Sequence, residues 1–151
     1  MNAIILAGGY GTRLRPLTNR TPKCLVKIGG RPLLDRWLST LSKSGIRSFL
    51  INTHYLAEEI VKYIESSKYA GCVTLTYEPH LLGTNGTLIA NRGFFEGQDG
   101  LLLHADNYSE ADISALLRAH AHRTIGCSMT MLTFASTQPQ SCGIVETDSQ
   151  G

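Results

Sequence analysis

Residues 4–35 read IILAGGYGTRLRPLTNRTPKCLVKIGGRPLLD, an apolar run that ends in a glycine-rich turn and continues into a basic stretch. A short apolar run before glycines suits a buried parallel strand, so we expect a strand over residues 2–7. The turn over residues 8–12 would point several backbone N–H groups at one concave spot, which suits phosphate oxygens. Every charged side chain from Arg13 to Arg31 is positive, and the first carboxylate is Asp35. The stretch therefore predicts a binding site for a polyphosphate.

Beyond this stretch, strand-like and helical patterns alternate along the chain. We expect helices over residues 32–44, 56–66, 84–91 and 110–122, and further strands over residues 46–52, 72–78, 100–105, 127–134 and 143–146. Short links between strands and helices indicate βαβ units, so the sequence predicts a doubly wound, Rossmann-like, mostly parallel α/β sheet with helices on both faces. Ligands of such sheets bind outside the carboxyl ends of the strands, where the glycine turn, Glu78 and Asp106 would all lie.

The composition is that of an ordinary globular protein of 151 residues, with 42% apolar residues, 17% charged residues and a net charge of +2. This net charge does not support binding to a nucleic acid polymer, but nine of the fourteen cations fall between Arg13 and Arg47. The N-terminal apolar run is too short for a signal peptide or a membrane span. Four scattered cysteines are most simply reduced thiols, so we expect a cytoplasmic protein without a membrane partner.

Two common glycine motifs do not fit the turn. A dinucleotide fingerprint starting at Gly9 would need glycine at position 14, which is Leu14, and this disfavours an NAD-binding protein. A phosphate-binding loop of the Walker type would need Gly-Lys where Arg13 and Leu14 stand. A plain strand-to-helix turn would explain the glycines but not the cations that follow them.

The pattern L-A-G-G-x-G-T-R-L-x-P-L-T, followed by P-K, resembles that of the sugar-1-phosphate nucleotidylyltransferases. Residues 77–86, 103–107 and 142–146 resemble further segments of this family in the same order, so the resemblance spans essentially the whole chain. It implies the transfer of a nucleoside monophosphate from a nucleoside triphosphate to a sugar 1-phosphate, with release of pyrophosphate. Guanylyltransferases for mannose 1-phosphate or a related heptose phosphate are the leading members.

The resemblance also implies roles for individual residues. Arg13 and Lys23 would be catalytic, Arg13 on the β- and γ-phosphates and Lys23 between the sugar phosphate and the α-phosphate. The nucleotide would contact Leu6, Ala7, Gly8, Gly9, Gly11, Thr12, Glu78 and Gly83, and the sugar would contact Asn107 and Gly143. Asp106 would hold Mg²⁺. Alternatively, Asp106 is the N-cap of the next helix, although Asn107 or Ser109 could fill that position.

Glu78 bears on the choice of base. A carboxylate can accept the two adjacent donors of guanine, N1–H and N2–H, whereas thymine and uracil offer one donor between two carbonyl oxygens. If Glu78 reaches the base, it would favour GTP. Alternatively, Glu78 is a solvated charge at the end of a strand and would favour no particular nucleotide. A uridylyl- or thymidylyltransferase is the alternative within the family. The alternative of another class is a non-catalytic regulatory subunit that binds nucleotide sugars, against which the presence of Arg13, Lys23 and Asp106 together argues.

Family members continue beyond the position of Gly151 with an E-K-P segment and a second metal-binding aspartate. We therefore expect residues 1–151 to form a single nucleotide-binding domain that is truncated at its C-terminal end and poorly active alone. Ala105 and Cys142 depart from the family pattern around the sugar, so the identity of the sugar stays open. The sequence also leaves a homo-oligomer open.

Overall fold

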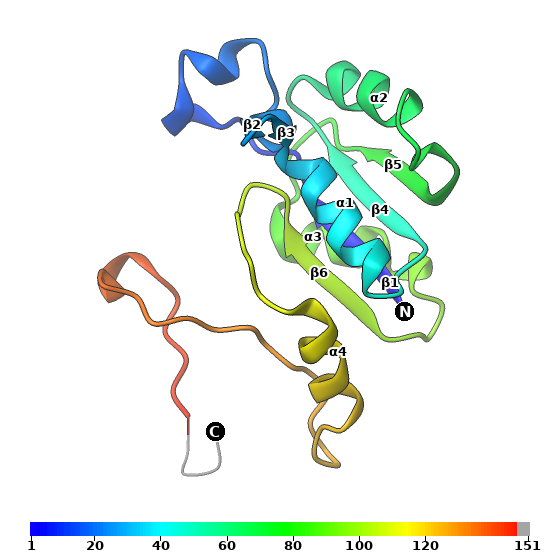
Figure 1. The fold of residues 1–151 in the computed structure, drawn as a ribbon, viewed down its shortest axis with the longest axis vertical. Helices are drawn as coiled ribbons and strands as arrows, with labels where there is room; N and C mark the ends of the chain where they lie inside the picture. Colours follow the sequence, from blue (N-terminus) through cyan, green and yellow to red (C-terminus); the bar gives the residue numbers. More distant parts are fainter. Residues whose placement is uncertain (148–151) are drawn as a thin grey trace. The chain divides into compact units, whose positions relative to one another are not determined.

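The computed structural model describes residues 1–147 and has two compact units, Met1–Ala111 and a second that begins at Asp112. The first unit contains a parallel sheet of four strands in the order β5-β4-β1-β6 (Figure 1). The strands are β1 (Asn2–Leu6), β4 (Phe49–Thr53), β5 (Val73–Tyr77) and β6 (Gly100–His104). The four strands predicted in this unit are therefore confirmed, with ends that differ by up to three residues.

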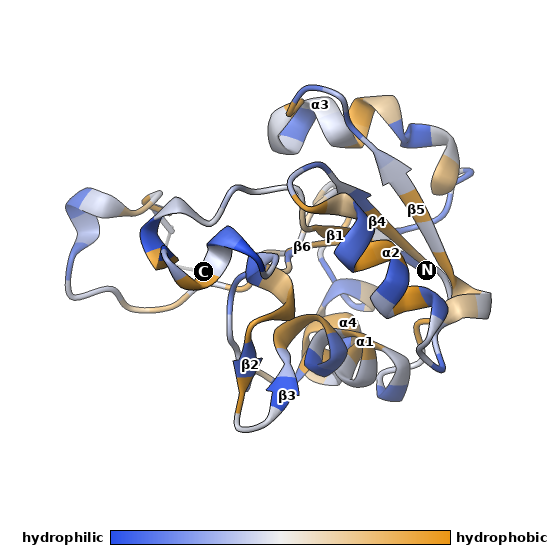
Figure 2. Cartoon of the chain, turned by 90° about the horizontal axis from the view of Figure 1, so that it is seen from above, coloured by the Kyte–Doolittle hydropathy of each residue, from blue (hydrophilic) through white to orange (hydrophobic). Residues whose placement is uncertain are grey.

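Helices cover the sheet on both sides, as predicted. The helices of the first unit are α1 (Leu33–Lys43), α2 (Ala57–Glu65) and α3 (Gly83–Ala90). Figures 1 and 2 place α1 and α3 on opposite faces of the sheet. The chain builds outward from β1 through β4 to β5, then returns by α3 to β6 on the other side of β1. Strand order thus reverses between β1 and β6, and the crevice outside their carboxyl ends is where such sheets bind ligands.

The core of the first unit lies between the central strands and α1. Every residue of β4 is buried, and Ile4 and Ile5 of β1 have no exposed surface. The helix α1 adds Leu34, Leu38 and Leu41, which recur at helical spacing and form one apolar side. In Figure 2, β1, β4 and parts of α1 carry the apolar colour. Burial of this kind fixes the strands firmly, and the loops at their carboxyl ends are held with them.

A small hairpin between the basic stretch and α1 was not predicted from the sequence. Strands β2 (Lys27–Ile28) and β3 (Arg31–Pro32) pair in antiparallel fashion around Gly29 and Gly30. These two glycines have φ values of 56° and 78°, as a two-residue hairpin turn requires. Local turn chemistry therefore explains why two glycines stand at this point in the sequence.

The second unit contains the helix α4 (Ile113–Ala121). This helix begins three residues later than predicted because Asp112 is its N-cap, with Oδ1 accepting the N–H of Ala115 at 3.0 Å. The cap is therefore Asp112 and not Asp106, Asn107 or Ser109. That residues 1–151 form a single domain stays a prediction.

The strands predicted over residues 127–134 and 143–146 are wrong, since these residues form no strand. Phe134 and Ile144 leave 81% and 65% of their surface exposed. A strand needs a neighbouring strand for its backbone hydrogen bonds, and an apolar β-rich pattern expresses only a local preference. Across residues 1–147, no helix has the length and apolar character needed to span a membrane.

Candidate nucleotide site

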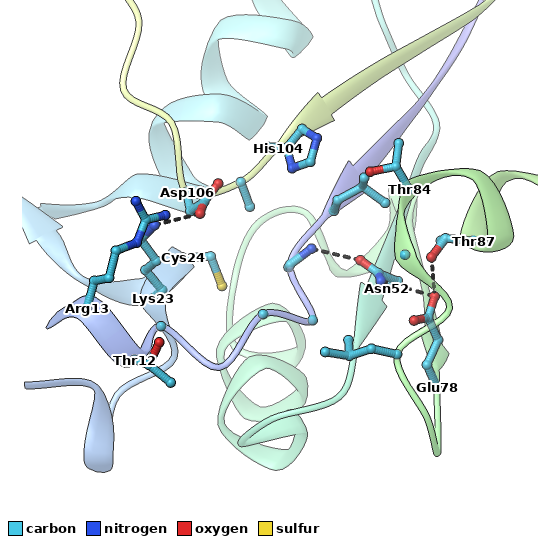
Figure 3. A pocket seen from close by; sticks show the side chains of 18 residues that line it. Thr12, Arg13, Lys23, Cys24, Asn52, Glu78, Thr84, Thr87, His104 and Asp106 are labelled. Carbon is cyan, nitrogen blue, oxygen red and sulfur yellow. Dashed lines mark hydrogen bonds and ion pairs between the residues drawn. The ribbon is translucent and has the colours of Figure 1, made fainter. Parts of the chain in front are cut away.

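A cavity of about 320 Å³ opens at the carboxyl ends of the strands. The parallel register sets Leu6 beside Asn52 on β4 and beside His104 on β6, so the residues that follow these strands meet at one edge. Figure 3 shows the cavity with residues from the glycine turn, the basic stretch and all four strand ends around it. The location expected from the sequence is therefore the location of the cavity.

The glycine turn folds tightly against the basic stretch. Gly11 has a φ of 63°, and its carbonyl oxygen accepts the hydroxyl of Thr18 at 2.8 Å. A Cβ on Gly11 would lie 2.9 Å from Thr18 Cγ2 and 3.2 Å from Lys23 Cβ. Both the backbone conformation and the space therefore require glycine here. The close contact with Lys23 brings the side chain of the basic stretch beside the turn.

One side of the cavity, which we call the cationic end, is formed by Arg13, Lys23 and Asp106. Lys23 Nζ lies 2.6 Å from Asp106 Oδ2, so residues 83 positions apart are joined by an ion pair (Figure 3). Arg13 lines the same side, and its guanidinium has no hydrogen bond or ion pair to the rest of residues 1–147. The cationic end therefore presents one unneutralised positive charge, together with a lysine whose single partner is an aspartate.

The donor set at the cationic end fits a magnesium ion that is shared with phosphate oxygens. Within residues 1–147, no three His, Cys, Asp or Glu side chains gather in a way that could hold a metal. Asp106 would therefore be a single carboxylate ligand, and the remaining positions on a metal would belong to phosphate or water. Mg²⁺ is commonly bound by one or two carboxylates plus substrate phosphates.

The opposite side of the cavity, which we call the Glu78 network, is buried and hydrogen-bonded throughout. Only 3% of the surface of Glu78 is exposed, and its carboxylate has no cationic partner in the part of the chain that the structure describes. Glu78 Oε1 accepts Asn52 Nδ2 at 3.1 Å and Thr87 Oγ1 at 2.5 Å, while Oε2 accepts the N–H of Leu82 at 3.2 Å. Asn52 Oδ1 in turn accepts the N–H of Ala7 at 2.7 Å. The carboxylate of Glu78 therefore links the end of β1, the end of β4, the loop before α3 and α3 itself.

A second set of contacts, through His54, joins the glycine turn to Glu78 at the end of β5. His54 Nδ1 lies 2.7 Å from the carbonyl oxygen of Glu78, and His54 Nε2 lies 2.9 Å from the hydroxyl of Tyr10. A carbonyl oxygen can only accept, so Nδ1 of His54 carries the proton. The rings of Tyr10 and His54 meet edge to face, with centroids 5.2 Å apart. Tyr10 itself is exposed, so its ring covers the outside of the turn.

Cys24 lies in the cavity wall next to Lys23. Its side chain is buried, and this burial is the main reason why the pKa of the thiol is raised to about 12. A backbone hydrogen bond opposes the rise, and the nearby charge of Asp106 contributes to it. Because the thiolate is the nucleophilic form, Cys24 is an inert wall residue and not a nucleophile at neutral pH.

The structure brings together most of the site residues predicted from the sequence. The cavity is lined by Leu6, Ala7, Gly8, Gly9, Gly11, Thr12, Arg13, Lys23, Glu78, Gly83 and Asp106. Asn107 lies outside the lining, and its carbonyl oxygen accepts Trp37 Nε1 at 2.7 Å. Gly143 belongs to the second unit, which is described separately. The predicted nucleotide, catalytic and metal residues therefore share one cavity, and the two predicted sugar residues are not among those that line it.

Sequence reasoning missed Asn52, Thr87, Leu81, Thr84 and Cys24, all of which line the cavity. Asn52 carried a signal, because it is the one amide in the buried strand Phe-Leu-Ile-Asn-Thr. A buried polar side chain at the carboxyl end of a strand needs a partner, and here it finds two. Thr87 has no comparable signal, since a threonine in a short helix is ordinary.

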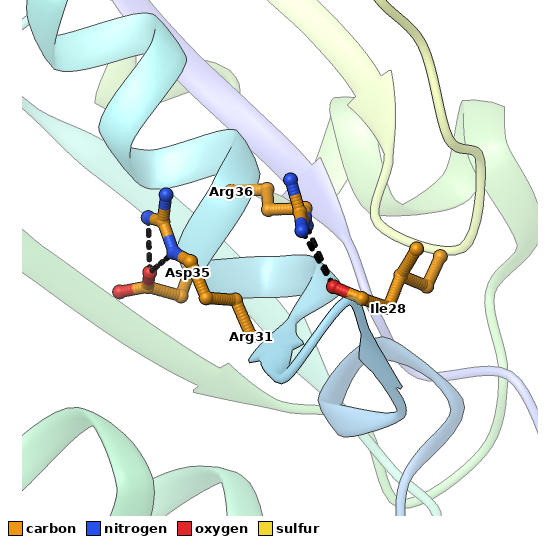
Figure 4. Close-up of polar contacts among 4 residues, drawn as sticks. All are labelled: Ile28, Arg31, Asp35 and Arg36. Atoms are coloured by element: carbon orange, nitrogen blue, oxygen red, sulfur yellow. Dashed lines mark hydrogen bonds and ion pairs between the residues drawn. The ribbon is translucent and has the colours of Figure 1, made fainter.

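The basic stretch divides in the structure. Arg31 pairs with Asp35, and both its Nε and a terminal nitrogen bind the same carboxylate oxygen (Figure 4). Arg36 donates to the carbonyl oxygen of Ile28 and so ties α1 to the hairpin (Figure 4). Neither arginine lines the cavity. Part of the predicted cationic run therefore supports the local fold and takes no part in the cavity.

Comparison with known proteins identifies the family. Residues 2–151 match the family model described as nucleotidyl transferase. The chain belongs to the nucleotidyl transferase family. The family predicted from the sequence is thus confirmed, and so is its mostly parallel α/β fold.

The relatives differ in the nucleotide that their names specify. A mannose-1-phosphate guanyltransferase of Debaryomyces hansenii is 31% identical over 152 residues, which cover 98% of this chain and 41% of that protein. The crystal structure of HddC from Yersinia pseudotuberculosis with GMP-PN has a TM-score of 0.69 at 27% identity, covering 80% of this chain and 54% of that one. The CTP:phosphocholine cytidylyltransferase LicC of Streptococcus pneumoniae has a TM-score of 0.62 at 32% identity, covering 74% and 47%. This chain spans about two fifths of the length of the curated relatives it matches.

Proposed function

We propose that the cavity binds a nucleoside triphosphate, with GTP favoured, and that the protein transfers the nucleoside monophosphate to a sugar 1-phosphate. One observation carries this proposal: Lys23 and Asp106 meet at 2.6 Å in the crevice between β1 and β6, beside Arg13, which is unpaired within residues 1–147. A polyphosphate needs positive charge and a shared metal at one place, and this is the place where that chemistry is assembled. Membership of the nucleotidyl transferase family supports the reaction type.

In the proposed reaction an oxygen of the sugar phosphate bonds to the α-phosphorus, and the bond from that phosphorus to the β-phosphate oxygen breaks. Pyrophosphate leaves with the electron pair of the broken bond. Such transfers depend on positioning and on neutralising charge, with little covalent help from the protein. Lys23 would bridge the sugar phosphate and the α-phosphate, and Arg13 would bind the departing phosphates through its planar guanidinium.

Asp106 would hold Mg²⁺ together with phosphate oxygens of the nucleotide. The ion would supply neutralising charge to the phosphates when it is bound. In the protein alone, Asp106 is paired with Lys23. With nucleotide and metal bound, Asp106 would be the residue that holds the ion, and Lys23 would be free to contact phosphate.

The preference for GTP rests on similarity to the mannose-1-phosphate guanyltransferases and to the GMP-PN complex of HddC. Glu78 gives it less support than the sequence suggested, because both its oxygens are already engaged by the chain. The chain is also structurally similar to a cytidylyltransferase, so the preferred base has to be determined by experiment. The sugar contacts of Asn107 and Gly143, a homo-oligomeric state and a cytoplasmic location stay predictions.

A thermal-shift titration tests the proposal. The protein is titrated with GTP, dTTP, UTP, ATP and CTP, each with and without Mg²⁺, because a ligand that binds the folded state raises the melting temperature. We expect the largest rise with GTP, a greater rise with Mg²⁺, and loss of the rise in Lys23→Ala. Lys27→Ala serves as the matched control, since Lys27 lies on the exposed hairpin outside the cavity. A folded protein whose melting temperature responds to no triphosphate would contradict the proposal.

A further inference from the structure

We infer that Glu78 is a positioning residue that holds the glycine turn for the phosphates, and not a group that reads the base. The inference rests on the proposed function, since it concerns how the same cavity binds its triphosphate. One part of the inference needs no nucleotide, because Glu78 is linked to the start and to the middle of the turn in the protein alone.

The hydrogen bonds of the carboxylate leave no room for a guanine edge. Recognition of guanine N1–H and N2–H needs a free lone pair on each carboxylate oxygen, and each oxygen has two. Oε1 of Glu78 already accepts from Asn52 and Thr87. Bidentate recognition of guanine would therefore displace one of these donors and leave a buried polar group without its partner, which is unfavourable.

The carboxylate also determines how Asn52 is oriented. A carboxylate can only accept, so the amide nitrogen of Asn52 faces Glu78 and the amide oxygen is left for the N–H of Ala7. Ala7 follows β1 and directly precedes the glycine turn. The side chain of Glu78 thus fixes the start of the turn through one intermediate residue.

The backbone of Glu78 fixes the middle of the turn. Its carbonyl oxygen accepts Nδ1–H of His54, and Nε2 of His54 contacts the hydroxyl of Tyr10. The two ends of a four-residue segment, Ala7 and Tyr10, are therefore both linked to residue 78. On the other side, Leu82 and Thr87 link the same carboxylate to the start of α3, where Gly83 and Thr84 line the cavity.

Replacement of Glu78 by glutamine shows why the network needs a charged carboxylate, which accepts hydrogen bonds on both oxygens. If the glutamine oxygen faces Asn52 and Thr87, its NH₂ group faces the N–H of Leu82, and two donors oppose each other. If the glutamine is flipped, its NH₂ group faces the amide nitrogen of Asn52, and Asn52 must turn its own NH₂ group toward the N–H of Ala7. Each arrangement loses at least one link, so Glu78→Gln weakens the network while it preserves the side-chain volume.

The test compares wild type, Glu78→Gln and Thr87→Val, with Glu65→Gln on the exposed side of α2 as the control for charge loss. Amide hydrogen exchange at Ala7 is measured first, without ligand. Affinities for GTP, ATP and inorganic tripolyphosphate with Mg²⁺ are then measured by calorimetry. Thr87→Val removes one donor with little change of shape, so it keeps the test informative if Glu78→Gln does not fold.

We expect about tenfold faster exchange at Ala7 in Glu78→Gln, with a smaller increase in Thr87→Val and none in Glu65→Gln. We expect the affinities for GTP, ATP and tripolyphosphate to fall by a common factor of about five to ten, so that the ratio of GTP to ATP is unchanged. Loss of GTP affinity alone, with tripolyphosphate binding intact, would overturn the inference and make Glu78 a base reader. Unchanged exchange at Ala7 in both network variants would also overturn it. If wild type binds no triphosphate, the proposed function fails, while exchange at Ala7 still decides whether Glu78 holds the turn.

Discussion

The two sides of the cavity are built in opposite ways. At the cationic end, the side chains of Lys23 and Asp106 are partly exposed; among residues 1–147 they pair only with each other, and Arg13 has no partner. In the Glu78 network, a buried carboxylate is satisfied by three donors of the chain. The charges of the cationic end are therefore available to a ligand. The hydrogen bonds of the Glu78 network are instead made within the chain and hold the segments around the cavity in place. Substitutions in the network should act mainly on stability, and those at the cationic end mainly on binding.

Among substitutions that leave the Glu78 carboxylate in place, Thr87→Val is expected to have the largest effect on the stability of the network. The substitution removes a buried hydroxyl that donates to the Glu78 carboxylate, and hydrogen bonds to charged groups contribute about 1.5–3 kcal/mol. We expect the free energy of unfolding in urea to fall by about this amount. Thr84→Val on the same helix is the matched control, and its unfolding should stay within about 0.5 kcal/mol of wild type. Equal effects of the two substitutions would mean that the carboxylate does not anchor the helix.

At the cationic end, Lys23→Ala should weaken binding more than any other single substitution. A lysine that contacts phosphate contributes one or more charge-assisted hydrogen bonds, so we expect about 10- to 100-fold weaker binding of GTP with Mg²⁺ by calorimetry. Unfolding should change little, because the ion pair with Asp106 is partly exposed. Lys27→Ala should leave the affinity within about twofold. A large loss of stability without a loss of affinity would reverse the comparison between the two sides.

The sequence predicted the cationic end better than the network, and the reason is physical. The glycine turn, Arg13 and Lys23 fall within one short stretch, so composition and motif spacing reveal them. The network joins Asn52, Glu78 and Thr87 across separate elements, and its contacts depend on strand register and on the return of α3. These contacts between residues far apart in the chain cannot be read from the sequence. The parallel sheet was predictable because apolar runs alternate with amphipathic helices.

The predicted strand over residues 127–134 shows the limit of the same reasoning. Its apolar, β-rich pattern favours a strand, but within residues 1–147 no strand pairs with it. The hairpin around Gly29 and Gly30 is the converse case, since each of its strands has only two residues. Such short strands carry no periodicity, so only the turn chemistry of the two glycines could have revealed them.

Cys24, between the two sides, should give stability a dependence on high pH. Burial raises the pKa of its thiol from the ordinary value of 9.0 to about 12. The folded state therefore favours the protonated thiol, and this contribution is complete below pH 9 and is lost as the pH rises from 9 to 12. We expect the free energy of unfolding of wild type to fall by up to about 1.4 kcal/mol per pH unit more than that of Cys24→Ala. Urea unfolding at pH 8, 9 and 10 checks this slope, with the exposed Cys142→Ala as the control.

The smallest effect is expected from Arg31→Ala, outside both sides of the cavity. The ion pair with Asp35 is exposed on the Arg31 side, and exposed pairs contribute little to stability because solvent screens them. We expect almost no change in the free energy of unfolding and no change in GTP affinity. Weakened GTP binding in Arg31→Ala would show that the whole basic stretch, and not only Arg13 and Lys23, attracts the ligand.

The central claim is that one cavity at the carboxyl edge binds a nucleoside triphosphate with its phosphates at the cationic end. The most direct measurement is the map of amide chemical shifts in ¹⁵N-labelled protein titrated with a non-hydrolysable GTP analogue and Mg²⁺. The account predicts the largest changes at residues 8–13, at Lys23 and at Asp106, smaller ones at Gly83 and Thr84, and none on the outer side of α2. Shifts centred on the hairpin and on Arg31 and Arg36, with the glycine turn unchanged, would contradict it.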